Sequence, residues 1–208
     1  MGDITRMRHL AGATLLLTIT LAAGCTASPP PGSTGPTDRG RPAPDATFNY
    51  ILGSGTLSSR LGTRIRQREG LTYGVSSSFS ASSFDKRASL TITAICNPQN
   101  VGRVEKAVQE ELDRLLRDGV TQDELDKART GYLQSQKVGR SSDTALAGIL
   151  SNLSHAGRTM AFSAEFEKRI EALTPDQVLS ALRKHIDPKK LVIVIAGDFE
   201  TKASASGE

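Results

Sequence analysis

Residues 52–74, L-G-S-G-T-L-S-S-R-L-G-T-R-I-R-Q-R-E-G-L-T-Y-G, decide how the middle of this chain folds. Gly53-Ser54-Gly55 breaks one short helix, and the apolar residues that follow predict a second short helix that stops at Gly70. Residues 73–81 then alternate apolar side chains with Gly and Ser, which is typical of a half-buried strand. The stretch therefore predicts a helix-to-strand junction at Gly70.

The rest of the chain predicts an α+β fold around this junction. The patterns indicate a second strand over 90–96, helices over 101–119, 121–137, 145–157, 162–172 and 174–185, and a buried final strand over 191–196. Because the helices form one block, we expect an antiparallel-rich sheet with helices packed on one face. Three strands are few for so much helix, so we expect the first strand of the sheet to be missing.

The N-terminus has the features of an export signal. Two arginines precede an apolar run of about 14 residues, which is too short to span a bilayer as a helix. The run ends in Leu21-Ala22-Ala23-Gly24-Cys25, which is similar to a bacterial lipoprotein processing site. We therefore predict a signal peptide over 1–24, lipid attachment at Cys25, and a location on the bacterial cell envelope. An ordinary secretory signal with an incidental cysteine is the alternative.

Composition divides the remaining sequence into three parts. Residues 25–46 are rich in Pro, Gly and Ser and predict an extended tether. The domain is expected over 47–200, and residues 201–208 are expected to form a disordered tail. The net charge is +4, basic residues alternate with acidic ones, and aromatic residues make up 4% of the chain. These values disfavour nucleic-acid binding.

The chemistry-bearing residue types form no recognisable catalytic motif. The glycines near residue 53 lack the third glycine of a dinucleotide fingerprint and the Gly-Lys-Ser/Thr of a phosphate-binding loop. The three histidines lack the spacing of a zinc peptidase, and His185 is expected to complement the dipole of its helix. Cys96 ends a strand pattern and is expected to be a small buried side chain. We predict no catalytic residue, no bound metal and no cofactor.

Arg66 and Tyr73 are the remaining candidates for a functional site. Arg66 falls in the last turn of the predicted helix and Tyr73 at the start of the next strand. A guanidinium offers five hydrogen-bond donors and a phenol one, which suits them to hold a peptide carbonyl or a developing oxyanion. The structural alternative is that Arg66 complements the helix C-terminus and Tyr73 fills a strand face.

The 52–74 stretch resembles the second, non-zinc domain of the pitrilysin and insulinase metallopeptidases, a family that includes the mitochondrial processing peptidase subunits. The similarity continues through the hairpin, the 121–137 helix and the closing I-A-G-D-F at 195–199. It covers roughly residues 47–200.

This resemblance implies a division of labour. In that family the zinc site lies in the first of two similar α+β domains, and the second supplies an arginine and a tyrosine that hold the substrate. By position these are Arg66 and Tyr73. The family's second domain normally opens with a strand and most of a helix before the L-G-S-G segment, whereas here a predicted signal and tether precede Phe48.

The leading hypothesis is therefore a lipid-anchored, non-catalytic domain that contributes peptide contacts to a separate zinc-bearing subunit. Its expected partners are that subunit, a peptide substrate and a membrane, with zinc bound only by the partner. The alternative is a truncated structural or protein-binding lipoprotein with no role in proteolysis.

Overall fold

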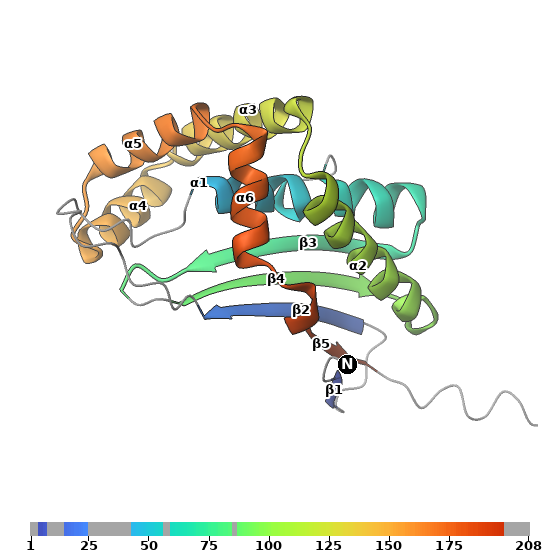
Figure 1. Ribbon diagram of the computed structural model, residues 1–208. Coiled ribbons are helices and arrows are strands. Elements are labelled where there is room, and N and C mark those ends of the chain that lie inside the picture. The colour runs from blue at the N-terminus through green and yellow to red at the C-terminus, as the bar shows by residue number, and fades with distance from the viewer. Residues whose placement is uncertain (1–3, 8–14, 25–42, 56–58, 85–86, 198–208) are drawn as a thin grey trace, which may run out of the picture.

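The sheet has five strands in the order β1-β5-β2-β4-β3 (Figure 1). The computed structural model describes residues 4–7, 15–24, 43–55, 59–84 and 87–197, with the backbone alone for the first two ranges. Its strands are β1 (Ile4–Met7), β2 (Leu15–Gly24), β3 (Thr72–Ala81), β4 (Arg87–Cys96) and β5 (Val192–Ala196). The β1–β5 pair is parallel and the other pairs are antiparallel.

The helices lie on one side of this sheet (Figure 1). They are α1 (Ala43–Asn49), α2 (Val101–Asp118), α3 (Gln122–Gly139), α4 (Asp143–His155), α5 (Met160–Glu171) and α6 (Pro175–His185). Short turns of π or 3₁₀ helix complete the layer: η1 (Tyr50–Ser54), η3 (Gly62–Arg68), η4 (Pro98–Asn100) and η5 (Pro188–Lys190). The predicted α+β class, with an antiparallel-rich sheet covered on one face, is confirmed.

The prediction that a strand is missing is wrong. Strands β1 and β2 come from the segment that we interpreted as a signal peptide, and β2 lies between β4 and β5. A short apolar run rich in Leu, Ile and Thr satisfies a signal sequence and a buried strand equally well, so periodicity alone does not separate them. Export and processing of this segment stay a prediction.

The packed domain also begins earlier than the predicted boundary at residue 47. Helix α1 starts at Ala43, and both Ala43 and Ala46 are buried. Pro44 is compatible with this helix because it stands in the first turn, where an amide donor has no partner within the helix. The rest of the predicted tether, Cys25 and the predicted tail at 201–208 lie outside the described residues.

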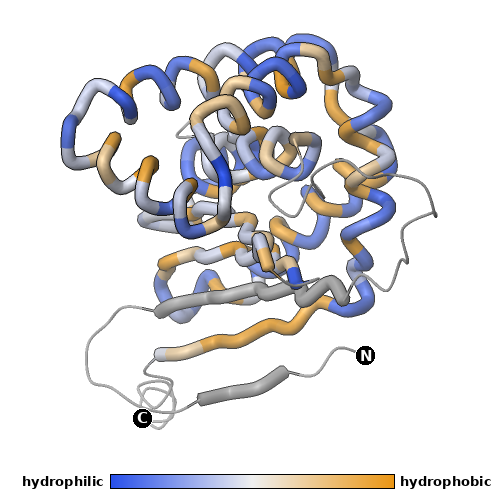
Figure 2. The backbone as a smooth tube through the Cα atoms, turned by 90° about the vertical axis from the view of Figure 1, so that its left-hand side faces the viewer, coloured by the Kyte–Doolittle hydropathy of each residue, from blue (hydrophilic) through white to orange (hydrophobic). Residues whose placement is uncertain are grey.

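The core lies between the helices and the sheet. Phe48, Leu52 and Ile65 are fully buried, and the Phe48 ring packs edge-on against Phe79 of β3 with centroids 6.0 Å apart. Strand β5 is hydrophobic along its length (Figure 2). Among the described residues, no helix combines the length and apolar character needed to cross a membrane.

A polar side-chain pair joins α1, the first α-helix of the described chain, to α6, the last. The Asp45 side chain is fully buried at the start of α1, and its Oδ1 lies 2.9 Å from Nδ1 of His185 in the last turn of α6. We predicted that His185 complements its own helix dipole. The structure gives it a more specific partner, which is distant in sequence and therefore invisible to local patterns.

Gly53 permits close contact between η1 and β3. A Cβ added at Gly53 would lie 2.6 Å from the backbone nitrogen of Ser77, closer than any real contact. Nearby, the Ser77 hydroxyl donates to the carbonyl of Asn49 at 3.1 Å and so joins β3 to the last residue of α1, directly before η1. Any larger residue at position 53 must push η1 away from the strand.

We expect Gly53→Ala to destabilise the protein by about 1–3 kcal/mol, because overpacking displaces η1 from β3. Gly102→Ala is the matched control: nothing lies within 4 Å of its added Cβ in α2, and the better helix propensity of Ala is expected to add up to about 1 kcal/mol. Urea unfolding at pH 7 measures both. Equal stability of Gly53→Ala and the wild type would contradict this packing.

Candidate functional site

The helix-to-strand junction is held by local backbone bonds. The amide of Glu69 donates to the carbonyl of Arg64 at 3.0 Å, and the amide of Leu71 donates to the carbonyl of Ile65 at 2.9 Å. Between them Gly70 has a φ of 60°, a left-handed conformation that glycine adopts without strain. The predicted end of the helix at Gly70 is therefore confirmed, and it has a physical cause.

Buried neighbours fix the chain on the far side of Gly70. The Leu71 side chain is buried, and its carbonyl accepts a hydrogen bond of 3.2 Å from Nδ2 of Asn100. Thr72 is buried and begins β3 opposite Cys96. The segment that presents Tyr73 is thus anchored immediately before the tyrosine.

Tyr73 occupies an irregularity in the ladder between β3 and β4. Thr72 pairs with Cys96 and Gly74 with Ile95, so Tyr73 is an extra residue on its strand. Such bulges redirect a side chain out of the regular alternation. Tyr73 is 66% exposed, and its hydroxyl donates to Oδ1 of Asn97 at 3.1 Å. The structural alternative, in which Tyr73 fills a buried strand face, does not hold.

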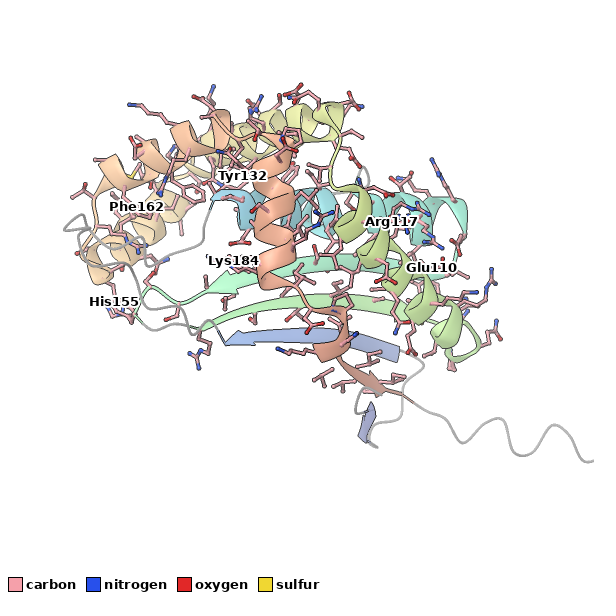
Figure 3. The ribbon with its side chains drawn as sticks, in the orientation of Figure 1. Glu110, Arg117, Tyr132, His155, Phe162 and Lys184 are labelled. Carbon is pink, nitrogen blue, oxygen red and sulfur yellow. The ribbon has the colours of Figure 1, made fainter. Side chains whose placement is uncertain are left out.

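Arg66 is exposed in the last turn of η3 and forms no hydrogen bond or ion pair with any described residue. Neighbouring Arg64 is different, since its guanidinium contacts Glu69, Glu110 and Glu111. Glu110 lies on α2 and is labelled in Figure 3. The hydrogen bond with Glu110 is the main reason that the pKa of Arg64 is raised. Arg64 therefore ties η3 to α2, whereas Arg66 is available to a ligand.

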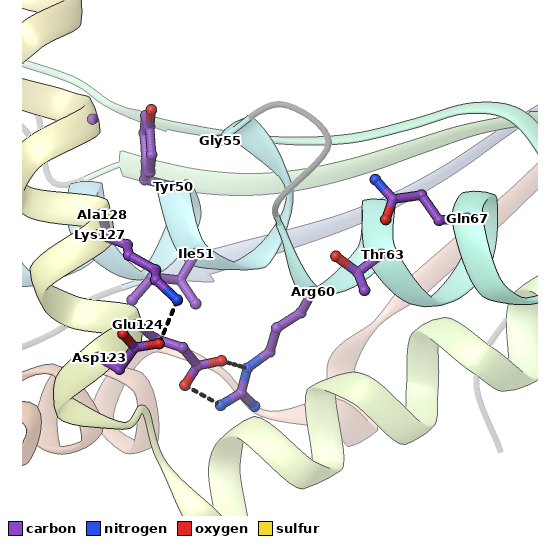
Figure 4. A pocket seen from close by; sticks show the side chains of 11 residues that line it. Tyr50, Ile51, Gly55, Arg60, Thr63, Gln67, Asp123, Glu124, Lys127 and Ala128 are labelled. Atoms are coloured by element: carbon purple, nitrogen blue, oxygen red, sulfur yellow. Dashed lines mark hydrogen bonds and ion pairs between the residues drawn. The ribbon is translucent and has the colours of Figure 1, made fainter.

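A cleft of about 560 Å³, lined by both polar and apolar residues, lies beside η3 (Figure 4). It runs between η1 and η3 on one side and the first turns of α3 on the other, and Tyr50, Gln67 and Lys127 are among its lining residues. Arg66 and Tyr73 are not among the residues that line it. The cleft is therefore a neighbour of the candidate site rather than part of it.

An ion pair closes one end of this cleft (Figure 4). Nε and Nη2 of Arg60 donate to the two carboxylate oxygens of Glu124 at 2.7 and 2.8 Å, and Nη2 also donates to the carbonyl of Gly119 at 2.9 Å. Glu124 in addition accepts from the amide of Thr121 at 2.8 Å, which completes a capping box at the start of α3. The Glu124 carboxylate thus caps the start of α3 and also fixes Arg60, which lies just before η3.

The same contacts shift the ionisation of Glu124. Burial alone would raise the pKa of this carboxyl, but the hydrogen bonds from Arg60 and Thr121 outweigh burial and lower it. Cys96 shows the opposite case, since burial raises the pKa of its thiol and agrees with its predicted role as a small core residue.

The structure places the predicted substrate-binding residues at one junction, both exposed and without a hydrogen bond to each other. Cys25, the predicted lipid attachment site, lies outside the described residues. Sequence reasoning missed Asn97, whose side chain accepts the hydrogen bond from the Tyr73 hydroxyl. Among the described residues no group of three or more His, Cys, Asp or Glu side chains is placed to hold a metal, so these residues do not fit a zinc site.

Comparison with known proteins identifies this arrangement. Residues 30–132 match the family model described as the peptidase M16 inactive domain. The chain is 31% identical over 161 residues to an uncharacterized zinc protease of Streptomyces coelicolor, which covers 76% of this chain and 34% of that protein. The chain belongs to the M16 peptidase family. It carries the family's inactive, non-zinc domain, as the resemblance implied.

Solved M16 structures agree with this assignment. A crystal structure of a peptidase M16 inactive domain from Pseudomonas fluorescens superposes with a TM-score of 0.76 and 27% identity, covering 94% of this chain and 43% of that one. A protease from Helicobacter pylori has the same fold, with a TM-score of 0.75, 13% identity, and coverage of 95% and 44%. The chain spans about a third of the length of the curated relatives that it matches.

We expect Glu124→Gln to weaken the inactive domain by about 1–2 kcal/mol at pH 7, because the amide keeps the capping bond but loses the charge facing Arg60. Because the pKa of Glu124 is lowered in the folded protein, its ionised form stabilises the fold at pH values above the ordinary pKa of about 4.5. This stabilisation is lost as the pH falls through the lower pKa of the folded state. The difference between variant and wild type should therefore shrink on acidification. Urea unfolding from pH 7 to pH 3 measures it.

Asp123→Asn is the control for this titration, since the Asp123–Lys127 pair is exposed on both sides and is expected to contribute little. A Glu124→Gln variant whose stability runs parallel to the wild type at every pH would show that the Arg60 contact has no electrostatic role.

Proposed function

We propose that this chain is a non-catalytic M16 domain that holds peptide through Arg66 and Tyr73 for a separate zinc-bearing subunit. The observation that carries the proposal is the junction at Gly70, which presents two exposed donor side chains from a firmly anchored backbone. A preorganised site loses little freedom when it binds, so two such donors are well suited to an extended peptide.

The chemistry of the two side chains is complementary. The Arg66 guanidinium provides charged donors with no described acceptor to give up. The Tyr73 hydroxyl donates to Asn97, so its oxygen remains able to accept a hydrogen bond from a peptide amide. The hydroxyl can also give up Asn97 and donate its hydrogen bond to a peptide carbonyl instead. Together they match the alternating donors and acceptors of a peptide backbone.

A separate zinc subunit is proposed because this chain matches the inactive domain of a family whose relatives are named zinc proteases. The Streptomyces coelicolor relative and one from Mycobacterium tuberculosis are named zinc proteases, and this chain matches about a third of each. Because this chain matches the inactive domain of the family, we propose that the metal-bearing domain it works with lies on another polypeptide. We further propose that Cys25 carries a lipid that anchors the protein to the cell envelope, on the strength of the sequence Leu21–Cys25.

To test the peptide site, Arg66→Ala and Tyr73→Phe are compared in the complex that co-purifies with the lipidated protein from its own membranes. Each variant is expected to lower kcat/KM for fluorescein-labelled casein by roughly 10–100-fold. This is the effect of losing one hydrogen bond between the peptide and the Arg66 or Tyr73 side chain. The unfolding midpoint should not change, because Arg66 is unpaired and Tyr73 is exposed.

Arg68→Ala is the matched control, since Arg68 is exposed in the same turn of η3. It is expected to retain activity within about three-fold. Full activity of both Arg66→Ala and Tyr73→Phe in an intact complex would overturn the peptide site and favour the alternative, a structural or protein-binding lipoprotein. The absence of any zinc protein from the co-purified material would overturn the partner.

Lipid attachment has its own test. Cys25→Ala is expected to move the protein from the detergent-rich to the aqueous phase on Triton X-114 partitioning, because the variant has no thiol to acylate. Cys96→Ala is the control and should stay in the detergent-rich phase. Metabolic labelling with an alkyne fatty acid reports the modification directly, and an unlabelled wild-type protein would refute it.

A further inference from the structure

Strand β2 is the connection between the two halves of the described sheet. All its residues pair with β4, from Leu15 opposite Cys96 to Gly24 opposite Arg87. On its other side, residues Leu16 to Thr20 pair with β5. No register joins β4 directly to β5 among the described strands.

Strand β5 depends on the N-terminal segment for its whole ladder. Its described partners are β1 and β2, which both precede Cys25. Ile193 and Ile195 of β5 are buried in the core cluster. Cleavage before Cys25 would thus leave a core strand without any described ladder partner and expose the edge of β4.

The sequence of β2 fits its place in the register. From Leu15 to Leu21 its odd-numbered positions hold Leu or Ile opposite buried residues of the neighbouring strands: Leu17 opposite Ala94 and Ile195, Ile19 opposite Ile92 and Ile193, and Leu21 opposite Leu90. Thr18 and Thr20 stand opposite Thr93 and Thr91. This alternation matches the pleat of a strand, and the same run also meets the need of a signal sequence for apolar residues.

From this register we infer that the edges of β4 and β5 form a strand-accepting slot, filled by residues 15–24 in the unprocessed chain and by an extended apolar strand of a partner protein after processing. The inference rests on the proposed processing at Cys25. The occupant runs antiparallel to both edges and has apolar residues at alternate positions over about ten residues, as β2 does. Unpaired strand edges favour such addition, because the added backbone satisfies exposed amides and carbonyls.

The first test places β2 in the unprocessed full-length chain by disulfide trapping. Thr18→Cys with Thr93→Cys joins residues in direct register, where antiparallel Cα atoms lie about 5 Å apart. Thr18→Cys with Ser89→Cys is the control, because four residues along the strand add roughly 13 Å. We expect rapid oxidation of the first pair only, mapped by peptide mass spectrometry. Equal trapping of both pairs, or of neither, would overturn the slot.

The second test asks whether the slot accepts a strand from outside. Ile19→Pro in the full-length chain removes a backbone donor from a residue that pairs with β4 and β5. A lysine-flanked peptide with the sequence of residues 15–24 should bind this variant in a 1:1 complex and slow amide exchange in β5 about ten-fold or more. The oxidised Thr18→Cys/Thr93→Cys chain should not bind this peptide, because its slot is already filled. A second peptide with proline at the position of Ile19 should not bind the Ile19→Pro chain.

The third measurement concerns the processed protein. In the mature protein isolated from its own membranes with its partners bound, the β5 amides should exchange slowly, and they should exchange faster once the partners are stripped. Fast exchange in the intact assembly would overturn the partner strand even if Ile19→Pro fails to fold. None of these measurements involves proteolysis, so their outcome is independent of the zinc-bearing subunit and of the peptide site at Arg66 and Tyr73.

Discussion

The left-handed backbone at Gly70 is the constraint on which the candidate site depends. It follows directly after the end of η3 and turns the chain into β3, with Leu71 buried on the far side. Any side chain at this position would be strained at a φ of 60°. The exposure of Arg66 before the turn and of Tyr73 after it follows from this one conformation and from the bulge at Tyr73.

The surrounding residues show why the site is presented rigidly. Arg64 holds η3 to α2, and Arg60 holds the chain before η3 to the first turn of α3. Both guanidiniums contact carboxylates and so fix the position of η3, whereas Arg66 has no such partner among the described residues. Arginines within one short segment therefore differ in their contacts according to whether a carboxylate lies within reach.

Local signals predicted much of this fold from the sequence. Gly70, the capping boxes at Thr121 and Thr174, and the apolar spacing of the helices act within a few residues, so the sequence pattern contains them. Three features were out of reach because they depend on residues far apart in the chain. These are the pairing of Asp45 with His185, the bulge that turns Tyr73 outward against Asn97, and the place of residues 15–24 in the sheet.

The N-terminal segment shows most clearly how one sequence meets two physical demands. Export machinery and a buried strand both select a short run of apolar and β-branched residues, so the run from Leu15 to Gly24 satisfies each. The neighbouring strands distinguish the two, because β4 and β5 present buried residues opposite alternate positions from Leu15 to Leu21. A chain that keeps the segment closes its own sheet, whereas a chain that loses it must find its strand elsewhere. Under the proposed processing at Cys25, the domain would therefore offer a different surface to other proteins.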